Sequence, residues 1–204
     1  MAANESDRAL TGHLFNVPNQ LTSARLVVAV ALFLFLSWQY YGTSLVLLII
    51  AASTDWIDGY WARKYGQVTV LGRILDPFAD KIVICGTFIF LAAVPQSEIQ
   101  AWMAVVVVGR ELLVTALRGF MEQRGQDFSA SMAGKWKMVL QCLAATLSLY
   151  LLTGLAVDGA TVAWREPPPP WLTRAVFLGV WAAVVMTVYS GIGYIVAAIR
   201  MMRP

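Results

Sequence analysis

Long apolar runs separated by short polar breaks dominate the chain. Six of these runs reach or approach the length of about 20 residues that a helix needs to cross the apolar core of a bilayer. The runs are Leu21–Ser37, Ser44–Ala62, Ile74–Val94, Ile99–Met121, Met132–Ala156 and Leu172–Met202. The longest break, Asp158–Pro170, contains Pro167–Pro170, which favours a stiff surface connector. The pattern predicts an all-α polytopic membrane protein with six transmembrane helices.

The composition agrees with this class. Hydrophobic residues make up 59% of the 204 residues and charged residues 13%, whereas a soluble domain carries about 25% charged residues. Cys85 and Cys142 both lie inside apolar runs. We interpret them as small buried hydrophobic residues and not as a disulfide or a metal-binding pair.

The basic residues are distributed unevenly among the breaks, which predicts the orientation. Six spans place both chain ends on one side. With the N-terminus in the cytoplasm, only Arg165 and Arg174 of the 15 Lys and Arg residues lie outside, and Arg110 lies within a span. This is the distribution that the positive-inside rule describes. We therefore expect a cytoplasmic N-terminal segment, residues 1–20, followed by one membrane domain over residues 21–204.

Four aspartates lie in the second and third runs, where ionisable residues are costly and mark functional sites. Asp55 and Asp58 are spaced i, i+3, and Asp76 and Asp80 are spaced i, i+4, so each pair shares a helix face. The short break between the runs makes the two helices antiparallel neighbours. All four carboxylates can then meet near the cytoplasmic surface. Such ligands bind magnesium, calcium or manganese, and a two-metal cluster would suit phosphoryl transfer.

Residues beside the first pair also favour a phosphate ligand. Gly59 and Ala62 share the face of Asp55 and Asp58, where small side chains leave room for a bulky group or for close helix packing. Arg63 follows at the cytoplasmic end of the run, and a guanidinium can bind a diphosphate through two hydrogen bonds. The alternative for a single aspartate is an ion pair with a neighbouring basic residue at a helix end.

Read together, these residues resemble the full signature of the CDP-alcohol phosphotransferase family. The string reads Asp55-x2-Asp58-Gly59-x2-Ala62-Arg63-x8-Gly72-x3-Asp76-x3-Asp80, with all eight fixed positions present. The resemblance implies a six-helix membrane fold, a homodimer, and a polar cavity open to the cytoplasm. It also implies transfer of a phosphatidyl group from CDP-diacylglycerol to the hydroxyl of an alcohol.

The resemblance implies a role for each matching position. The predicted metal ligands for two Mg2+ ions, with Mn2+ as the alternative, are Asp55, Asp58, Asp76 and Asp80, and Asp80 is also the predicted catalytic general base. The predicted contacts of CDP-diacylglycerol are Thr54, Gly59, Ala62, Arg63 and Gly72. These roles agree with the chemistry, since metal ions neutralise the diphosphate and a carboxylate takes the proton of the incoming hydroxyl.

Outside the signature, three further regions resemble the bacterial subgroup of this family that makes phosphatidylglycerophosphate. They are Asn16–Arg25, the pair Gly109–Glu111 and Ala116–Arg118, and Gly134–Lys137. This resemblance implies sn-glycerol 3-phosphate as the acceptor, with phosphatidylglycerophosphate and CMP as products.

An acceptor that is a phosphate monoester needs a second anion site. Four basic residues could supply it, Arg110, Arg118, Lys135 and Lys137, and we predict that Arg110, Arg118 and Lys135 form it. For Arg110, an ion pair with Glu111 or Asp80 is an equal alternative, because an unpaired guanidinium within a span is expensive. The remaining cations nearby, Lys137 and Arg124, are interpreted as residues that set the topology.

Two other interpretations remain open at this point. Inositol phosphate or phosphatidylglycerol could be the acceptor within the same family. In a different class, a cation channel or transporter would use the aspartates as its ion path, although acids clustered at one surface form no relay across a membrane. We expect the bacterial inner membrane as the location, with the active site facing the cytoplasm. The expected partners are CDP-diacylglycerol, glycerol 3-phosphate, the bilayer and a second copy of the chain, with no nucleic acid.

Overall fold

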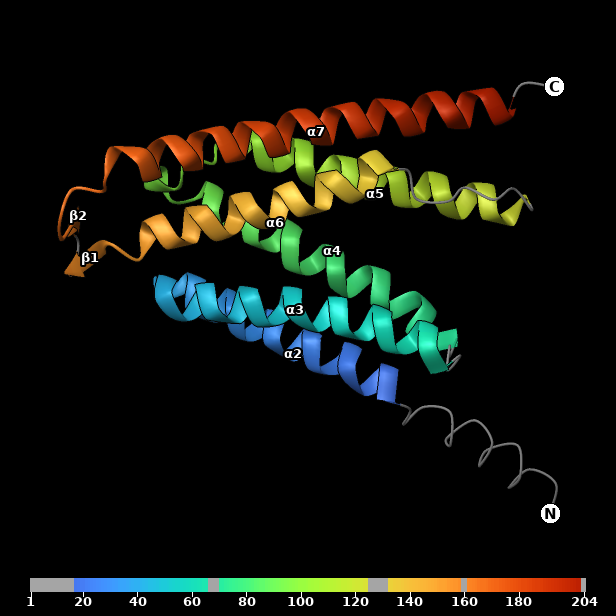
Figure 1. Cartoon of the computed structure of the whole chain (residues 1–204), viewed down its shortest axis with the longest axis horizontal. Helices are drawn as coiled ribbons and strands as arrows, with labels where there is room; N and C mark the ends of the chain where they lie inside the picture. Colours follow the sequence, from blue (N-terminus) through green and yellow to red (C-terminus); the bar gives the residue numbers. More distant parts are fainter. Residues whose placement is uncertain (1–16, 66–69, 125–131, 159–160, 203–204) are drawn as a thin grey trace, which may run out of the picture. The chain divides into compact units, whose positions relative to one another are not determined.

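The computed structural model of the chain describes residues 17–65, 70–124, 132–158 and 161–202. Within these ranges the chain forms six α-helices, a short 3-10 turn and a two-stranded hairpin (Figure 1). The helices are α2 (Val17–Ser37), α3 (Tyr41–Tyr65), α4 (Val70–Ala92), α5 (Ala101–Gln123), α6 (Met132–Leu152) and α7 (Pro170–Met202). The turn is η1 (Pro95–Ser97), and the strands are β1 (Leu155–Asp158) and β2 (Thr161–Trp164).

The helices confirm the all-α fold class, and each predicted run corresponds to one helix. The largest differences are four residues at one helix end, since α2 and α4 each begin four residues before the predicted start and α6 ends four residues before the predicted end. The N-terminus of α7 lies at Pro170 because a proline at the first helical position loses no hydrogen bond. Apolar runs therefore locate the helices in this chain well.

The hairpin corrects one prediction, since the break Asp158–Pro170 was expected to be only a connector. The fifth helix ends at Leu152 and not at Ala156, and the next residues pair with β2 from Leu155↔Trp164 to Asp158↔Thr161. The sequence signal was present, because Asp-Gly between short segments rich in Val and Thr favours a tight β-turn. The proline run then follows the hairpin and leads into α7.

The chain divides into two compact units, Met1–Val83 and Ile84–Pro204. In the first unit α2 packs on α3, and both helices bury small or aliphatic residues at helical spacing. On α2 these are Ala29, Leu32 and Leu36, and on α3 they are Leu48 and Ala51. The repeat of three to four residues is that of one helix face packed against another.

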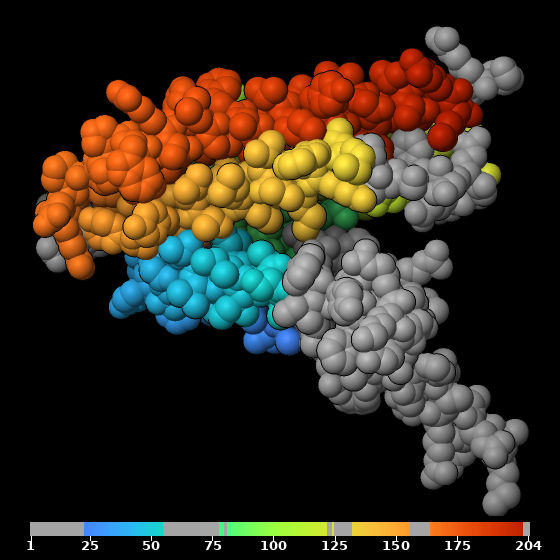
Figure 2. Space-filling view, in the orientation of Figure 1, coloured from blue at the N-terminus to red at the C-terminus, as the bar shows by residue number. Residues whose placement is uncertain are grey.

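In the second unit α7 packs against both α5 and α6 (Figure 1). Side chains of α6 and α7 meet along the visible face of the unit (Figure 2). The two backbones approach closely at Gly179, where an added Cβ would lie 3.5 Å from Leu147 Cδ1. A hydroxyl contact ties α6 to η1, because Ser148 Oγ donates to the carbonyl of Ser97. The Ser97 hydroxyl in turn donates to the carbonyl of Leu91 at 2.6 Å.

The outward faces of the helices are largely apolar. Large side chains such as Val27, Val105 and Leu178 are more than half exposed, and helices that are apolar on every side are typical of membrane proteins. In the described part of the chain, the stretch Pro170–Met201 is long and apolar enough to cross a membrane. Shorter apolar helical stretches are Ser23–Ser37, Tyr41–Thr54 and Lys81–Ala92.

Close packing of α6 on α7 gives a testable prediction. Ala144 is fully buried on α6, and a Cβ added at Gly179 would lie 4.0 Å from its Cα. Ala144→Leu should therefore lower the free energy of unfolding by roughly 1–3 kcal/mol through overpacking. Thermal unfolding of the purified protein in detergent measures the change. The control is Ala182→Leu, an exposed position on α7, and equal melting temperatures for the two variants would contradict the packing.

Candidate functional site

Charged and polar side chains gather within the second unit where α5, α6 and α7 pack together. We call this set the α5–α7 cluster, and it consists of Arg110, Glu111, Arg118, Lys137 and Tyr194. Three helices contribute to it, so its geometry depends on their packing (Figure 1). Ionisable groups among apolar helices are costly unless they are paired or have a function.

Glu111 is at the centre of the cluster. Its side chain and that of Lys137 are both buried, with 6% and 5% of each residue exposed. Glu111 Oε1 accepts from Lys137 Nζ at 2.5 Å and from Arg110 Nη1 at 3.1 Å. One carboxylate oxygen therefore binds cations from two helices, in a low-dielectric environment where such contacts are strong.

Tyr194 of α7 lies against both arginines of α5. Its ring centroid is 5.3 Å from Arg110 Cζ, which is the geometry of a cation–π contact. Its hydroxyl accepts from Arg118 Nη2 at 3.4 Å. Gly191, about one turn away on α7, makes room for the Arg110 stem, because an added Cβ would come 3.2 Å from Arg110 Cγ.

The cluster retains unused capacity for an anion. Among the described residues, neither Arg110 Nε nor Arg118 Nε has a hydrogen-bond acceptor, although both atoms are buried. The cluster also holds three cations, Arg110, Arg118 and Lys137, against the single carboxylate of Glu111. A buried donor without a partner is costly. Surplus positive charge and unused N–H groups are the features of a phosphate site.

The structure brings together two of the three predicted acceptor residues. Arg110 and Arg118 both belong to the cluster, and the ion pair of Arg110 with Glu111, considered as an alternative, is present. Lys135 is exposed on α6, and its predicted role is not tested. Arg124 is exposed and packs its guanidinium 4.4 Å from the ring centroid of Phe120.

Lys137, which we interpreted as a residue that sets the topology, also makes a buried contact that this interpretation did not predict. It is one of the most buried charged residues of the described part and is paired with Glu111. Lys135 and Lys137 are two positions apart, so they point about 200° apart around the helix. Lys137 instead shares a face with Gln141 and Ser148, both fully buried. That spacing was the signal that could have identified Lys137.

The predicted donor residues lie on the two helices of the signature. In the backbone, α3 carries Thr54, Asp55, Asp58, Gly59, Ala62 and Arg63, and α4 carries Gly72, Asp76 and Asp80. Apart from Thr54, their side chains lie outside the described residues. Thr54 Oγ1 donates to the carbonyl of Ile50 at 2.7 Å, which leaves its lone pairs for a ligand. The nucleotide contact predicted for Thr54 remains a prediction.

The backbone is compatible with a shared metal site. The five Cα–Cα steps from Tyr65 to Val70 span at most about 19 Å, which keeps the adjoining turns of α3 and α4 near each other. Carboxylate oxygens are the ligands that Mg2+ prefers. The donor set therefore fits a divalent cation, although no group of three metal-ligating side chains occurs among those that the structure describes.

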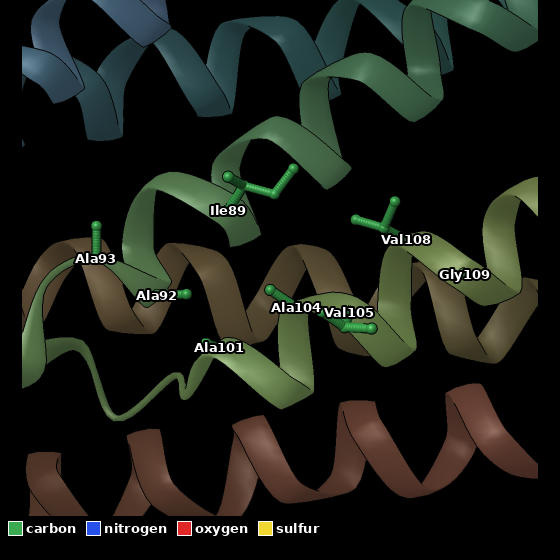
Figure 3. A pocket seen from close by; sticks show the side chains of 8 residues that line it. All are labelled: Ile89, Ala92, Ala93, Ala101, Ala104, Val105, Val108 and Gly109. Atoms are coloured by element: carbon green, nitrogen blue, oxygen red, sulfur yellow. The ribbon is translucent and has the colours of Figure 1, made fainter.

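An apolar recess of about 570 Å3 lies between the end of α4 and the first half of α5 (Figure 3). Its walls are Ile89, Ala92, Ala93, Ala101, Ala104, Val105, Val108 and Gly109. With no charged lining, it does not match the polar cavity that the sequence predicts, and that cavity remains a prediction.

The two glycines near Tyr194 provide a test of the cluster geometry. Gly193 has open space where a Cβ would be added, so Gly193→Ala should stabilise α7 by about 0.5–1 kcal/mol through helix propensity. Gly191→Ala should stabilise the protein less than Gly193→Ala, or should destabilise it, because the added methyl group would press on the Arg110 stem. Unfolding in detergent compares the two variants. Equal stabilisation would mean that Arg110 is not held as described.

Comparison with known proteins agrees with the sequence signature. The family model described as CDP-alcohol phosphatidyltransferase matches residues 15–189. A Bacillus subtilis (strain 168) relative is 33% identical over 196 residues, covering 89% of this chain and 94% of its own length. A Haemophilus influenzae relative is 31% identical over 193 residues, which cover 90% of this chain and 94% of the relative. One from Escherichia coli K12 is 29% identical over 190 residues, with 90% and 95% covered.

All three relatives carry the name "CDP-diacylglycerol--glycerol-3-phosphate 3-phosphatidyltransferase". The matched region includes the whole signature from Asp55 to Asp80 and the three helices of the α5–α7 cluster up to Tyr189. The match extends over most of the chain, so this chain belongs to the CDP-alcohol phosphatidyltransferase family.

Proposed function

We propose that this chain transfers the phosphatidyl group of CDP-diacylglycerol to sn-glycerol 3-phosphate, giving phosphatidylglycerophosphate and CMP. The relatives named above carry this activity in their names. The observation that carries the acceptor assignment is the α5–α7 cluster, where, among the described residues, three cations lie against one carboxylate and two guanidinium N–H groups have no acceptor.

The charge of the cluster favours a phosphate monoester as acceptor. The excess of cations complements the charge of such a group, which is about −1.5 to −2 near neutral pH. Free glycerol would leave this site empty, and phosphatidylglycerol offers a phosphodiester with less charge. Inositol phosphate has the same phosphate chemistry, so the names of the relatives favour glycerol 3-phosphate over it.

For the donor, we propose the sites that the signature implies. Asp55, Asp58, Asp76 and Asp80 would hold two Mg2+ ions, with Mn2+ as the alternative. When bound, these ions would neutralise the diphosphate and the charge that develops on the departing CMP. The nucleotide lipid would lie against the small residues of the signature and Arg63. The remaining proposed contacts are Thr54, Gly59, Ala62 and Gly72.

The proposed chemistry is a single displacement. Asp80 accepts the proton of the acceptor hydroxyl, and the hydroxyl oxygen forms a bond to the phosphorus of the phosphatidyl group. The bond from that phosphorus to the CMP oxygen breaks, and CMP leaves. Arg63 holds the diphosphate, and the α5–α7 cluster holds the phosphate of glycerol 3-phosphate.

We place the enzyme in the bacterial inner membrane as a homodimer. In this proposal all six helices span the bilayer, residues 1–20 are cytoplasmic, and the polar cavity opens to the cytoplasm. The apolar outward faces of the helices support this arrangement. Family membership favours catalysis over a cation channel or transporter.

The metal site gives the first functional prediction. Asp55→Asn, Asp58→Asn and Asp76→Asn should each abolish turnover, because each removes a ligand that acts on the transition state. Expression and stability in detergent should change little. Initial rates of CMP release at saturating magnesium measure the effect, with Glu166→Gln, at an exposed carboxylate, as the control. Near wild-type rates for two of the three variants would refute the metal assignment.

The acceptor site gives the second functional prediction. Arg110→Ala and Arg118→Ala should each raise KM for glycerol 3-phosphate about 10- to 150-fold, since a charge-assisted contact contributes roughly 1.5–3 kcal/mol. KM for CDP-diacylglycerol should stay nearly constant, and Arg63→Ala should show the reverse.

The control for this experiment is Arg174→Ala, at an exposed position on α7, which should leave both KM values unchanged. The wild type should use free glycerol very poorly. If glycerol reacts as well as glycerol 3-phosphate, the acceptor assignment is wrong while the family assignment stands.

A further inference from the structure

A carboxylate in a phosphate site requires an explanation. Glu111 repels an anionic acceptor, and yet it is buried in the middle of the α5–α7 cluster. Stability alone does not explain this ion pair, because replacing a buried ion pair by apolar residues is often neutral or stabilising. The position of Glu111 therefore indicates a role connected with the cations themselves.

The geometry shows what Glu111 does to those cations. Lys137 has a long flexible stem and comes from α6, whereas Arg110 comes from α5. A single oxygen, Oε1, binds Lys137 Nζ at 2.5 Å and Arg110 Nη1 at 3.1 Å. Glu111 thereby holds two charges from different helices beside one point.

Both cations keep donors for a ligand while bound to Glu111. The Lys137 ammonium carries three N–H groups, and Glu111 takes one of them. Arg110 Nε is buried without an acceptor among the described residues. On the other side Tyr194 packs its ring on Arg110 and accepts from Arg118. The carboxylate and the tyrosine together limit where the cations can move.

We propose that Glu111 is a positioning residue for the acceptor phosphate, acting through Lys137 and Arg110 without touching the substrate. This inference rests on the proposed function. It predicts that acceptor binding weakens when the negative charge of Glu111 is removed. Simple electrostatics predicts the opposite, because removing a negative charge makes the site more positive. The two accounts therefore differ in the sign of one measured quantity.

The test uses Glu111→Gln in the full-length purified enzyme, with Glu166→Gln as the matched control at an exposed position. Glu111→Gln keeps the side-chain shape but releases the two cations. KM for glycerol 3-phosphate should rise about tenfold or more, as expected for loss of ordered charge-assisted contacts. KM for CDP-diacylglycerol and kcat at saturating acceptor should each stay within about threefold of the wild-type values. This is the pattern expected when only binding of the acceptor is weakened. An unchanged or lower KM for the acceptor overturns the inference.

A double variant tests whether Glu111 acts through Lys137. If it does, Glu111→Gln combined with Lys137→Met should raise the acceptor KM by clearly less than the product of the two single effects, because residues in one network are not additive. The part of the effect that passes through Arg110 remains in the double variant. Multiplicative effects overturn the inference. If Glu111→Gln does not fold, Glu111→Asp takes its place, since it keeps the charge but shortens the reach. A wild-type acceptor KM for Glu111→Asp then overturns the inference.

Failure of this inference can be distinguished from failure of the proposed function. A wild-type enzyme that does not use glycerol 3-phosphate contradicts the proposed function and this inference with it. A wild-type enzyme that uses it, with a variant at Glu111 that binds it equally well, contradicts only the role of Glu111.

Discussion

The cost of placing charge among apolar helices is the constraint on which the second unit depends. Arg110, Glu111 and Lys137 lie on helices that expose mostly apolar side chains. Each would be expensive alone, and each is held by the shared contact at Glu111 Oε1. This contact requires that the face of α5 with Glu111 and the face of α6 with Lys137 point toward each other. Among the described residues of the cluster, the cations outnumber the carboxylate, and this excess of positive charge can bind an anion.

The packing of α6 supports the same orientation. Lys137, Gln141 and Ser148 lie on one buried face of this helix. Gln141 Nε2 donates to Thr187 Oγ1 of α7 at 2.9 Å, and Ser148 donates to the Ser97 carbonyl. Rotating α6 to expose Lys137 would break both contacts and bury Lys135. The polar contacts that fix the fold and the cluster that binds the proposed anion are therefore parts of one arrangement.

Sequence alone located the helices because apolar runs and helices coincide in this chain. It missed the β1–β2 hairpin, since a short paired segment inside a break has no long-range hydrophobic pattern and depends on the Asp158 turn signal. It also gave Lys137 less weight than Lys135, because a charge-distribution rule does not record which way a side chain points around its helix, and the role of Lys135 remains a prediction. Glu111 was seen only as a partner of Arg110, and its contact with Lys137 across 26 residues required the structure. The roles of the four aspartates rest on their spacing and remain predictions.

The central claim is the transfer of the phosphatidyl group of CDP-diacylglycerol to glycerol 3-phosphate, and identification of the products tests it most directly. The purified full-length chain would be incubated with labelled CDP-diacylglycerol, Mg2+ and a panel of glycerol 3-phosphate, glycerol, inositol phosphate and phosphatidylglycerol. Mass spectrometry would then identify the lipid products. The account predicts phosphatidylglycerophosphate and CMP in equal amounts from glycerol 3-phosphate, and no product after chelation of divalent cations. Preferential transfer to another alcohol, or no CMP release with any of them, would contradict it.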